Sequence, residues 1–285
     1  MMADYTYMSL GGGIQSGTMA EMIAVGELPA PDLVVFADTH DEPDYVYRYI
    51  EYLRGRLAAV GVEVEIVSAG NLIDALMSGA GRFAAIPAFT VNEGQRGRLR
   101  RQCTREYKIT PIESEIRRRL VTRGLANPNK SGSILINKGV QVEAWLGISL
   151  DEVARMKPSR TAWITNRWPL IEQRMTRGDC VQWLTRHGLP IPKKSSCRIC
   201  PYHNDTYWRQ MRDNEPGDWQ AVVDFDNSLR DSRASRFVAT ATGDLYLHSS
   251  CVPLADVDLR TPEDRGQLRL FEDDGDMCDE GYCFI

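Results

Sequence analysis

The first third of the chain alternates short apolar runs with segments whose apolar residues have helical spacing. The apolar runs predict strands at residues 5–8, 33–36 and 62–67, and the helical spacing predicts helices at 19–25, 45–57 and 71–77. Strand and helix alternate, which is typical of an α/β fold with a parallel sheet and helices on both faces. Such a sheet binds its ligand at the carboxyl ends of the strands.

The rest of the chain has weaker periodicity. Residues 79–101 show little pattern and several Gly and Arg residues, which predicts a mobile loop. Helices are expected at 207–211 and 219–229, with Trp208, Trp219 and Phe225 facing inward, and a short strand or turn at 245–250. The predicted organisation is a nucleotide-binding domain at 1–190, a smaller and mainly helical cluster-binding region at 191–260 and a flexible acidic tail at 261–285.

One glycine-rich stretch, residues 8–20 (MSLGGGIQSGTMA), stands between the first predicted strand and the first predicted helix. Three consecutive glycines allow a tight turn that brings backbone N–H groups close to a ligand, and the helix start adds the positive end of its dipole. The stretch therefore predicts an anion site, most simply for phosphate. It contains neither the G-x-G-x-x-G dinucleotide fingerprint nor the Lys-Ser or Lys-Thr of a P-loop.

Composition sets broad limits on the class of protein. The 285 residues are 43% hydrophobic and 26% charged, which is ordinary for a globular chain with one α/β core and a smaller appendage. No segment approaches 18 uninterrupted apolar residues and no basic-then-apolar leader is present, so we expect a cytoplasmic protein without a membrane partner. The net charge of -5 argues against indiscriminate coating of nucleic acid.

Positive charge is nevertheless concentrated between Gly94 and Lys138, where the acidic residues are Glu106, Glu113 and Glu115. Clustered guanidinium groups there could bind a phosphate or sulfate, or the backbone of a nucleic-acid acceptor, and the sequence does not separate these two clients. Arg117 to Arg119 also fit a solvated helix face. The basic residues are Arg96, Arg98, Arg100, Arg101, Arg105, Lys108, Arg117, Arg118, Arg119, Arg123, Lys130 and Lys138.

Seven cysteines, an odd number, favour metal or redox chemistry over a disulfide framework in a cytosolic chain. Cys197 and Cys200 form a Cys-x-x-Cys turn followed by Pro201, a combination common around iron-sulfur clusters. The same pair also fits half of a zinc site or a dithiol couple. Cys180 lies on the apolar side of a predicted helix and is expected in the core. Thr176 and Asp179 form a capping-box pattern at the start of that helix.

The glycine loop resembles the pyrophosphate loop (PP-loop) of the adenine nucleotide α-hydrolase superfamily, usually Ser-Gly-Gly-x-Asp-Ser, and in particular the loop of some phosphoadenylyl sulfate (PAPS) reductases. Gly11 replaces the Ser and Gln15 replaces the Asp. The resemblance implies a Rossmann-like (HUP) sheet that binds ATP or another adenine nucleotide, and it implies Mg²⁺ less firmly because Gln15 is neutral. The implied nucleotide-binding residues are Ser9, Gly11, Gly12, Gly13, Gln15, Ser16, Asp38 and Thr39.

Asp38 and Thr39 end the second strand and resemble the Asp-Thr-Gly-x-Glu stretch of the family, although they could also cap the next helix. Farther along, Gly147 to Ser149 with Glu152 and Arg155 resemble the region that follows a core strand in these relatives.

A second point of resemblance is the segment from Cys103 through Lys108 to Pro111, which is similar to the Cys-Cys, Lys and Pro motif of iron-sulfur adenylyl sulfate (APS) reductases. Thr104 stands where the second cysteine would be. The resemblance implies a 4Fe-4S cluster on Cys103, Cys197 and Cys200, with the fourth iron either free or held by Cys251, His203 or His248.

This resemblance implies three possible functions. In ATP-dependent sulfur transfer to a nucleobase or related acceptor, Arg105 and Lys108 offset developing charge. In APS or PAPS reduction, Cys278 or Cys283 on the acidic tail attacks sulfur, although the tail lacks the family's Glu-Cys-Gly-x-His signature. The third function is nucleotide or nucleic-acid binding without turnover. A cysteine desulfurase or a thioredoxin-like protein would supply sulfur or electrons. Because Thr104 removes one reductase cysteine, sulfur transfer is the favoured hypothesis.

Overall fold

The computed structural model describes residues 3–78, 86–231, 243–260 and 264–266. Its internal contacts divide the chain into two compact units, each made of segments distant in sequence. Unit 1 comprises residues 1–38, 44–69 and 107–195, and unit 2 comprises residues 39–43, 70–106 and 196–285. Among the described helices, none has the length and hydrophobicity needed to cross a membrane.

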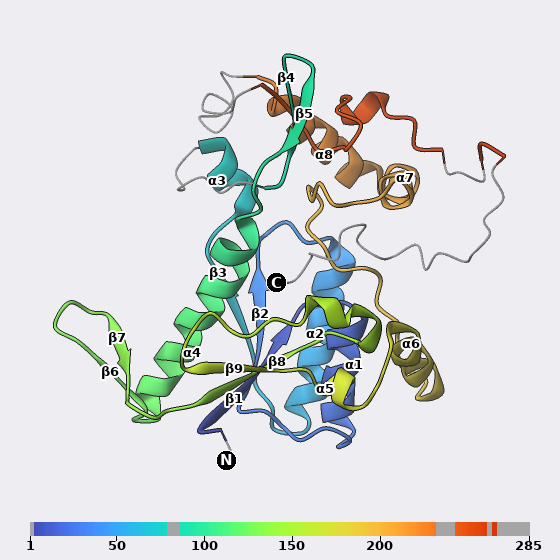
Figure 1. Cartoon of the computed structure of the whole chain (residues 1–285). Coiled ribbons are helices and arrows are strands. Elements are labelled where there is room, and N and C mark those ends of the chain that lie inside the picture. The colour runs from blue at the N-terminus through green and yellow to red at the C-terminus, as the bar shows by residue number, and fades with distance from the viewer. Residues whose placement is uncertain (1–2, 79–85, 232–242, 261–263, 267–285) are drawn as a thin grey trace. The chain divides into compact units, whose positions relative to one another are not determined.

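Unit 1 is built on a five-stranded, fully parallel sheet in the order β3-β2-β1-β8-β9. The chain runs outward from β1 to β3 and then returns to the opposite side of β1, so the topological switch point lies between β1 and β8 (Figure 1). This order confirms the predicted Rossmann-like sheet. The strands are β1 (Tyr5–Leu10), β2 (Leu33–Asp38), β3 (Val64–Ser68), β8 (Val142–Leu146) and β9 (Ile164–Arg167).

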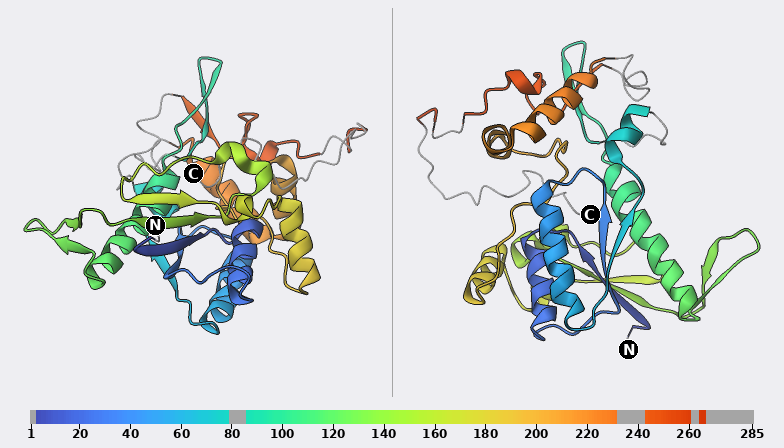
Figure 2. Two further views of the ribbon diagram at one scale, coloured as in Figure 1. Left: turned by 60° about the horizontal axis from the view of Figure 1, so that its bottom comes forward. Right: turned by 180° about the vertical axis from the view of Figure 1, so that it is seen from behind.

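Helices cover both faces of this sheet. Met8 and Leu10 of β1 pack into one core with helices α1, α2, α5 and α6, whereas Tyr5 and Tyr7 pack into a second core with α4. The two-residue alternation of β1 thus serves two buried faces. Figure 2 (right) shows α1 and α2 side by side. The helices are α1 (Ile14–Ala24), α2 (Asp44–Ala58), α4 (Thr110–Thr122), α5 (Pro169–Glu172) and α6 (Arg177–Arg186).

The contact between α1 and α2 is close because position 17 is glycine. A Cβ atom added to Gly17 would lie 2.5 Å from the hydroxyl oxygen of Tyr49 on α2. Such a distance is shorter than any real contact, so the two helices can approach this closely only without a side chain at position 17.

Two smaller elements complete unit 1, and a third belongs partly to each unit. The π-helix η1 (Thr104–Ile109) begins in the sequence of unit 2 and leads into α4, and a hairpin of β6 (Ala126–Pro128) and β7 (Ile134–Ile136) follows α4. A 3₁₀ segment, η2 (Leu150–Arg155), follows β8. The predicted capping box of Thr176 and Asp179 starts α6, and Cys180 is fully buried, as the sequence predicted.

Unit 2 contains helices α3 (Leu72–Ser78), α7 (Asp205–Asn214) and α8 (Pro216–Ser228) and the short 3₁₀ turn η3 (Leu254–Asp256). Its antiparallel sheet has the order β10-β4-β5, from β10 (Asp244–Tyr246), β4 (Phe89–Asn92) and β5 (Gln95–Arg98). Trp208 and Phe225 are buried as predicted, whereas Trp219 is half-buried.

Two sequence predictions about elements were wrong. Helix α1 begins at Ile14, five residues before the predicted start, so Gln15 and Ser16 belong to its first turn. The predicted loop at 79–101 contains the β4-β5 hairpin within its described part, 86–101, and its first residues lie outside the described ranges. The hairpin turns at Glu93 and Gly94, whose φ angles of 48° and 79° fit a two-residue primed turn.

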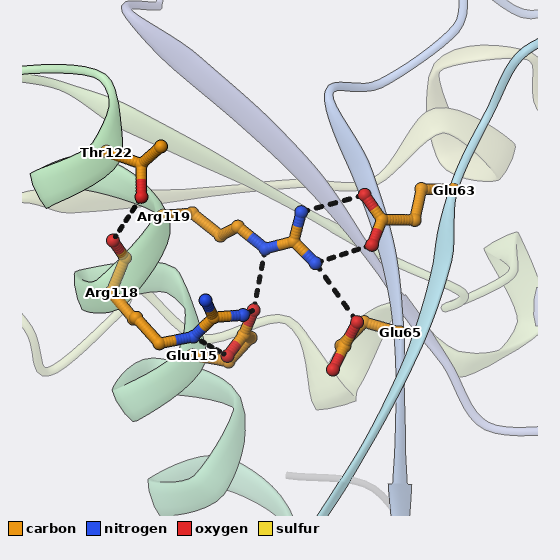
Figure 3. A network of polar contacts seen from close by, with 6 residues as sticks. All are labelled: Glu63, Glu65, Glu115, Arg118, Arg119 and Thr122. Atoms are coloured by element: carbon orange, nitrogen blue, oxygen red, sulfur yellow. Dashed lines mark hydrogen bonds and ion pairs between the residues drawn. The ribbon is translucent and has the colours of Figure 1, made fainter.

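The basic face predicted for Arg117 to Arg119 is partly used inside unit 1. Arg119 donates to both carboxylate oxygens of Glu63 at 2.7 and 2.6 Å, to Glu65 at 3.0 Å and to Glu115 at 2.6 Å (Figure 3). Arg118 also binds Glu115. The ion pairs of Arg119 with Glu63 and Glu65 connect α4 to the sheet edge at β3. Arg119 therefore stabilises the fold of unit 1.

Candidate functional site

The glycine loop connects β1 to α1 at the centre of the parallel sheet. Gly12 has φ +73°, a left-handed conformation that favours glycine, and a Cβ atom there would lie 2.9 Å from Cγ1 of Val46. The Gly11 N–H donates to the hydroxyl of Ser16 at 3.1 Å. The loop is therefore folded back on the first turn of α1, and position 12 excludes any side chain.

The N-terminus of α1 has the properties of an anion site. Its N-cap residue is Gly13, so no side chain at that position caps the helix, and its first turn contains no acidic residue. The first N–H groups of a helix have no acceptor within the helix, and they carry the positive end of its dipole. A phosphate placed at this terminus would accept from these groups.

Other segments of unit 1 meet this loop at the topological switch point. The side-chain amide of Gln15 donates to the hydroxyl of Ser149 at 3.4 Å. Gly147, which directly follows β8, lies so close to Ser16 that an added Cβ atom would be 2.9 Å from the Ser16 nitrogen. The hydroxyl of Ser195 donates to the Gly11 carbonyl. The carboxyl ends of β1 and β8 thus form one polar edge, the usual ligand position in such folds.

The other residues predicted to bind nucleotide in unit 1 belong to the same edge of the sheet. Ser9 pairs with Val35 and Leu146 near the end of β1. Asp38 is the last residue of β2, is 9% exposed and accepts a hydrogen bond from the Tyr47 hydroxyl at 2.9 Å. The structure therefore brings Ser9, Gly11, Gly12, Gly13, Gln15, Ser16 and Asp38 to one edge, and their nucleotide-binding role stays a prediction.

Thr39 belongs to unit 2, where residues 39–42 hold the Cys-x-x-Cys turn. The Thr39 hydroxyl lies 3.2 Å from the sulfur of Cys197, and the Cys197 thiol donates to a carboxylate oxygen of Glu42 at 3.6 Å. Thr39 therefore contacts a predicted metal ligand.

The turn from Cys197 to Cys200 is closed by its own backbone. The Cys200 N–H donates to the Cys197 carbonyl at 3.0 Å, and Nε2 of His203 donates to the same carbonyl at 2.9 Å. The His203 ring also stacks on Tyr207 with a centroid distance of 3.7 Å. His203 thus braces the turn through its Nε2 atom.

Asp41 anchors the two residues between these cysteines. Its carbonyl accepts from the Arg198 N–H at 2.8 Å, and its carboxylate accepts from the Ile199 N–H at 3.1 Å and from the Arg198 guanidinium at 3.2 Å. Arg198 also donates to Asp218 at 2.7 Å. The Asp41 side chain is fully buried, and this burial raises its pKa to about 7 against the opposing effects of the Ile199 N–H and Arg198.

Cys251 lies in a segment fixed by a buried carboxylate. Asp226 accepts from the backbone N–H groups of Leu247 and Leu254, both at 2.9 Å. Between them, Cys251 has φ +55°, and burial raises the pKa of its thiol. Nε2 of His248 donates to a carboxylate oxygen of Asp205 at 2.9 Å, and its Nδ1 accepts from the Ser250 hydroxyl at 2.7 Å.

The remaining predicted site residues that the structure describes lie on η1 or directly before it. Cys103 is half-buried just before η1, and on η1 itself Arg105 is exposed and Lys108 is half-buried. Cys278 and Cys283 lie outside the described residues.

The predicted cluster can be tested against the donor set. Cys197 and Cys200 share one turn and fit two ligands of a metal centre. Within residues 3–78, 86–231, 243–260 and 264–266, however, no group of three or more His, Cys, Asp or Glu side chains is arranged to hold a metal ion. The described residues, as folded, do not by themselves form a complete iron-sulfur site, so we derive no reaction step through a cluster.

Comparisons with known proteins were made on both sequence and structure. No family model matches the chain, and no curated protein matches it. Among solved structures, it is similar to the phosphoadenylyl-sulfate (PAPS) reductase from Candida auris in a phosphate complex, with 14% identity, a TM-score of 0.37 and coverage of 66% of this chain and 75% of that one. The U34-tRNA thiolase NcsA from Methanococcus maripaludis, with its [4Fe-4S] cluster, has 14% identity, a TM-score of 0.34 and coverage of 90% and 82%.

The fold assignment rests on the strand order of unit 1.

Two residues of these sites were not among the sequence predictions. Ser195 donates to the glycine loop from 184 positions away, and Asp41 anchors the thiol turn from 157 positions away. Their positions in the sequence could have indicated a role. Asp41 lies shortly after the end of β2, and Ser195 lies two residues before Cys197 of the Cys-x-x-Cys turn.

Proposed function

We propose that the chain is a PP-loop enzyme that acts at the α-phosphate of an adenine nucleotide, and that its reaction is ATP-dependent sulfur transfer to a nucleobase or related acceptor. The observation that carries the proposal is the N-terminus of α1, which has glycine at its N-cap and lies at the switch point of a parallel sheet. Backbone N–H groups there suit the leaving pyrophosphate.

The proposed reaction has two steps. A carbonyl oxygen of the acceptor attacks the α-phosphorus of ATP, the bond to the bridging oxygen breaks, and pyrophosphate leaves with its electron pair. Hydrogen sulfide, as HS⁻, then attacks the carbon of that carbonyl group. The carbon-oxygen bond breaks, and the oxygen leaves as part of AMP. In this scheme the α1 terminus binds pyrophosphate, Gln15 and Ser149 orient it as neutral hydrogen-bonding groups, and Arg105 and Lys108 offset negative charge.

The Cys-x-x-Cys turn supports sulfur chemistry in this proposal, because Cys197 and Cys200 are held in one rigid turn. A 4Fe-4S cluster on Cys103, Cys197 and Cys200, with or without Cys251, would require Cys103 to be brought to that turn. The sulfur donor would be a protein such as a cysteine desulfurase.

One observation favours a second candidate, APS or PAPS reduction. The first turn of α1 contains Gln15 and no acidic residue that could hold Mg²⁺ with a triphosphate. In that reaction the thiolate of Cys278 or Cys283 attacks the sulfur, the sulfur-oxygen bond to phosphate breaks, and AMP or its 3′-phosphate leaves. A second thiol, from the tail or from a thioredoxin-like protein, then displaces sulfite and forms a disulfide. Binding of nucleotide without either product would indicate a sensor.

The decisive experiment incubates the anaerobically purified chain with ATP, sulfide and an RNA or DNA acceptor and measures AMP and pyrophosphate. We expect both products from the unmodified chain and none from Gly12→Ala, because the added Cβ atom would enter Val46. Gly26→Ala is the matched control, since Gly26 also has a positive φ, +83°, but an added Cβ atom there meets nothing within 4 Å. Loss of product in both variants, or sulfite from PAPS instead, would overturn the sulfur-transfer proposal.

The metal is tested separately by counting iron and zinc after anaerobic purification. About four irons per chain that fall away in Cys197→Ser and persist in Cys180→Ala would support the cluster, because Cys180 is buried in the core of unit 1. One equivalent of zinc would refute it.

A further inference from the structure

The antiparallel sheet of unit 2 has aromatic and basic residues at opposite positions of neighbouring strands. Its register places Tyr246 of β10 opposite Phe89 of β4, and Phe89 opposite Arg98 of β5. Directly opposite residues in antiparallel strands point to the same face. A tyrosine, a phenylalanine and an arginine therefore stand side by side across three strands, on what we call the aromatic face.

A second row on the aromatic face has Asp244, Val91 and Arg96. The opposite face has Leu245, which is fully buried, together with Thr90 and Gly97. In contrast, Phe89 and Tyr246 are half-buried and Arg96 and Arg98 are exposed. The sheet thus packs Leu245 inward and presents aromatic rings and guanidinium groups to solvent.

Arginines already lie on aromatic rings at both ends of this face. The Arg98 guanidinium is 5.2 Å from the ring centre of Tyr202, and Arg101 is 5.7 Å from the same ring. At the other end, Arg230 is 4.8 Å from the ring centre of Tyr246 while it donates to Asp226 and to the Leu245 carbonyl. The Tyr246 ring is therefore held in place, which lowers the entropic cost of stacking a ligand on it.

Tyr202 connects this face to the thiol turn, since it follows Cys200 and Pro201 directly. Arg98 and Arg101 on its ring bring the basic segment 96–101 next to that turn within unit 2. The combination of half-exposed aromatic rings on a sheet with exposed guanidinium groups beside them is suited to a chain of alternating bases and phosphates.

We propose that the aromatic face binds an unpaired segment of nucleic acid, with one base stacked on Phe89 and the next on Tyr246, and with Arg96 and Arg98 on the flanking phosphates. Binding of the strand does not depend on the proposed function. The further step, in which this strand is the acceptor of the reaction, rests on the proposed function. A single strand fits better than a duplex because its bases are free to stack on side chains.

Fluorescence anisotropy of labelled 15-residue oligonucleotides tests the proposal on the full chain without ATP, so its failure is distinct from failure of the AMP assay. We expect single strands to bind more tightly than the corresponding duplex. Phe89→Leu and Tyr246→Leu should each weaken binding about 5-fold to 50-fold with an unchanged salt dependence. Arg96→Ala and Arg98→Ala should each lower the slope of log affinity against log salt by about one.

The matched control is Arg212→Ala, which removes an exposed arginine of the same unit from α7 and should leave affinity unchanged. Parallel titrations with RNA and DNA oligonucleotides of the same sequence show which of the two the chain binds more tightly. If Phe89→Leu does not fold, stacking is tested with Tyr246→Leu and with the fluorescence of 2-aminopurine placed in the oligonucleotide. We expect this fluorescence to be quenched when the base stacks on an aromatic ring. Equal affinity for duplex and single strand, full affinity in both aromatic variants, or equal binding of heparin would show a charge-only surface and overturn the proposal.

Discussion

Two arginine-centred networks, one in each unit, use similar bonds for different purposes. Arg119 in unit 1 binds Glu63, Glu65 and Glu115, and the Glu63 side chain is 52% exposed. Arg198 in unit 2 binds Asp41 and Asp218, and the Asp41 side chain is fully buried. The first network joins a helix to a sheet edge that already share a hydrophobic core, whereas the second joins two irregular segments to each other and to α8.

This difference shows where a polar contact determines structure. The packing of Ile112, Ile116 and Leu120 positions α4 with or without its ion pairs. Residues 39–42 and 197–200 have no regular secondary structure, and Asp41 satisfies two backbone groups of the turn as well as Arg198. We therefore expect the Asp41 network to be more costly to break than the Arg119 network.

The largest effect is expected for Asp41→Ala. The substitution leaves the Ile199 N–H without a buried acceptor and leaves Asp218 as the remaining ion-pair partner of Arg198, and it should lower the free energy of unfolding of unit 2 by about 3 kcal/mol. Amide hydrogen exchange read by mass spectrometry should show faster exchange in residues 196–204 and little change in α4. Uniform exchange rates across both units would contradict the comparison.

The second effect is opposite pH dependence in the two networks. The pKa of Asp41 is raised by burial to about 7 from an ordinary 3.8, so its stabilising effect is full below pH 4 and is lost as pH rises toward 7. Hydrogen bonds from Arg119 lower the pKa of Glu63, so its contribution is full above its ordinary pKa and is lost as pH falls.

Exchange measured from pH 4 to 8, and corrected for the intrinsic rate, should show residues 196–204 losing protection with rising pH. Asp41→Asn serves as the control and should abolish this slope. A slope that survives in Asp41→Asn would assign the titration to another group.

A smaller loss is expected for Arg198→Met, which removes the ion pairs to Asp41 and Asp218 but keeps the backbone bonds from residues 198 and 199 to Asp41. We expect about 1 to 2 kcal/mol by urea unfolding. Restoration of stability in the double variant Arg198→Met with Asp41→Asn would show that the cost comes from the unpaired buried carboxylate. An additive loss would argue against that origin.

The smallest effect is expected for Arg119→Met, at about 1 kcal/mol or less, because Glu63 and Glu65 remain accessible to water and Glu115 keeps its ion pair with Arg118. Salt should distinguish this site, since 1 M NaCl screens exposed pairs strongly and buried pairs weakly. The difference between Arg119→Met and the unmodified chain should shrink in salt, and a salt-independent loss above 2 kcal/mol would place Arg119 in the same class as Arg198.

The sequence predicted those features that depend on neighbouring residues. The apolar runs of β1 and β2, the glycine loop and the capping box of Thr176 and Asp179 are all local patterns. The β4-β5 hairpin was missed because its second strand, Gln95–Arg98, has no apolar residue to mark an alternation. The contacts of Thr39 with Cys197 and of Ser195 with Gly11 join residues more than 150 positions apart, and no local pattern encodes such pairings.

The glycine at position 17 places a steric limit at the middle of α1. A methyl group there would collide with the end of the Tyr49 side chain, so either that ring or α1 would have to move. Because a helix is stiff, a movement of α1 at its middle would redirect the amides at its tip. Under the proposed function, enlarging residue 17 should therefore change anion affinity although the glycine loop itself keeps its sequence.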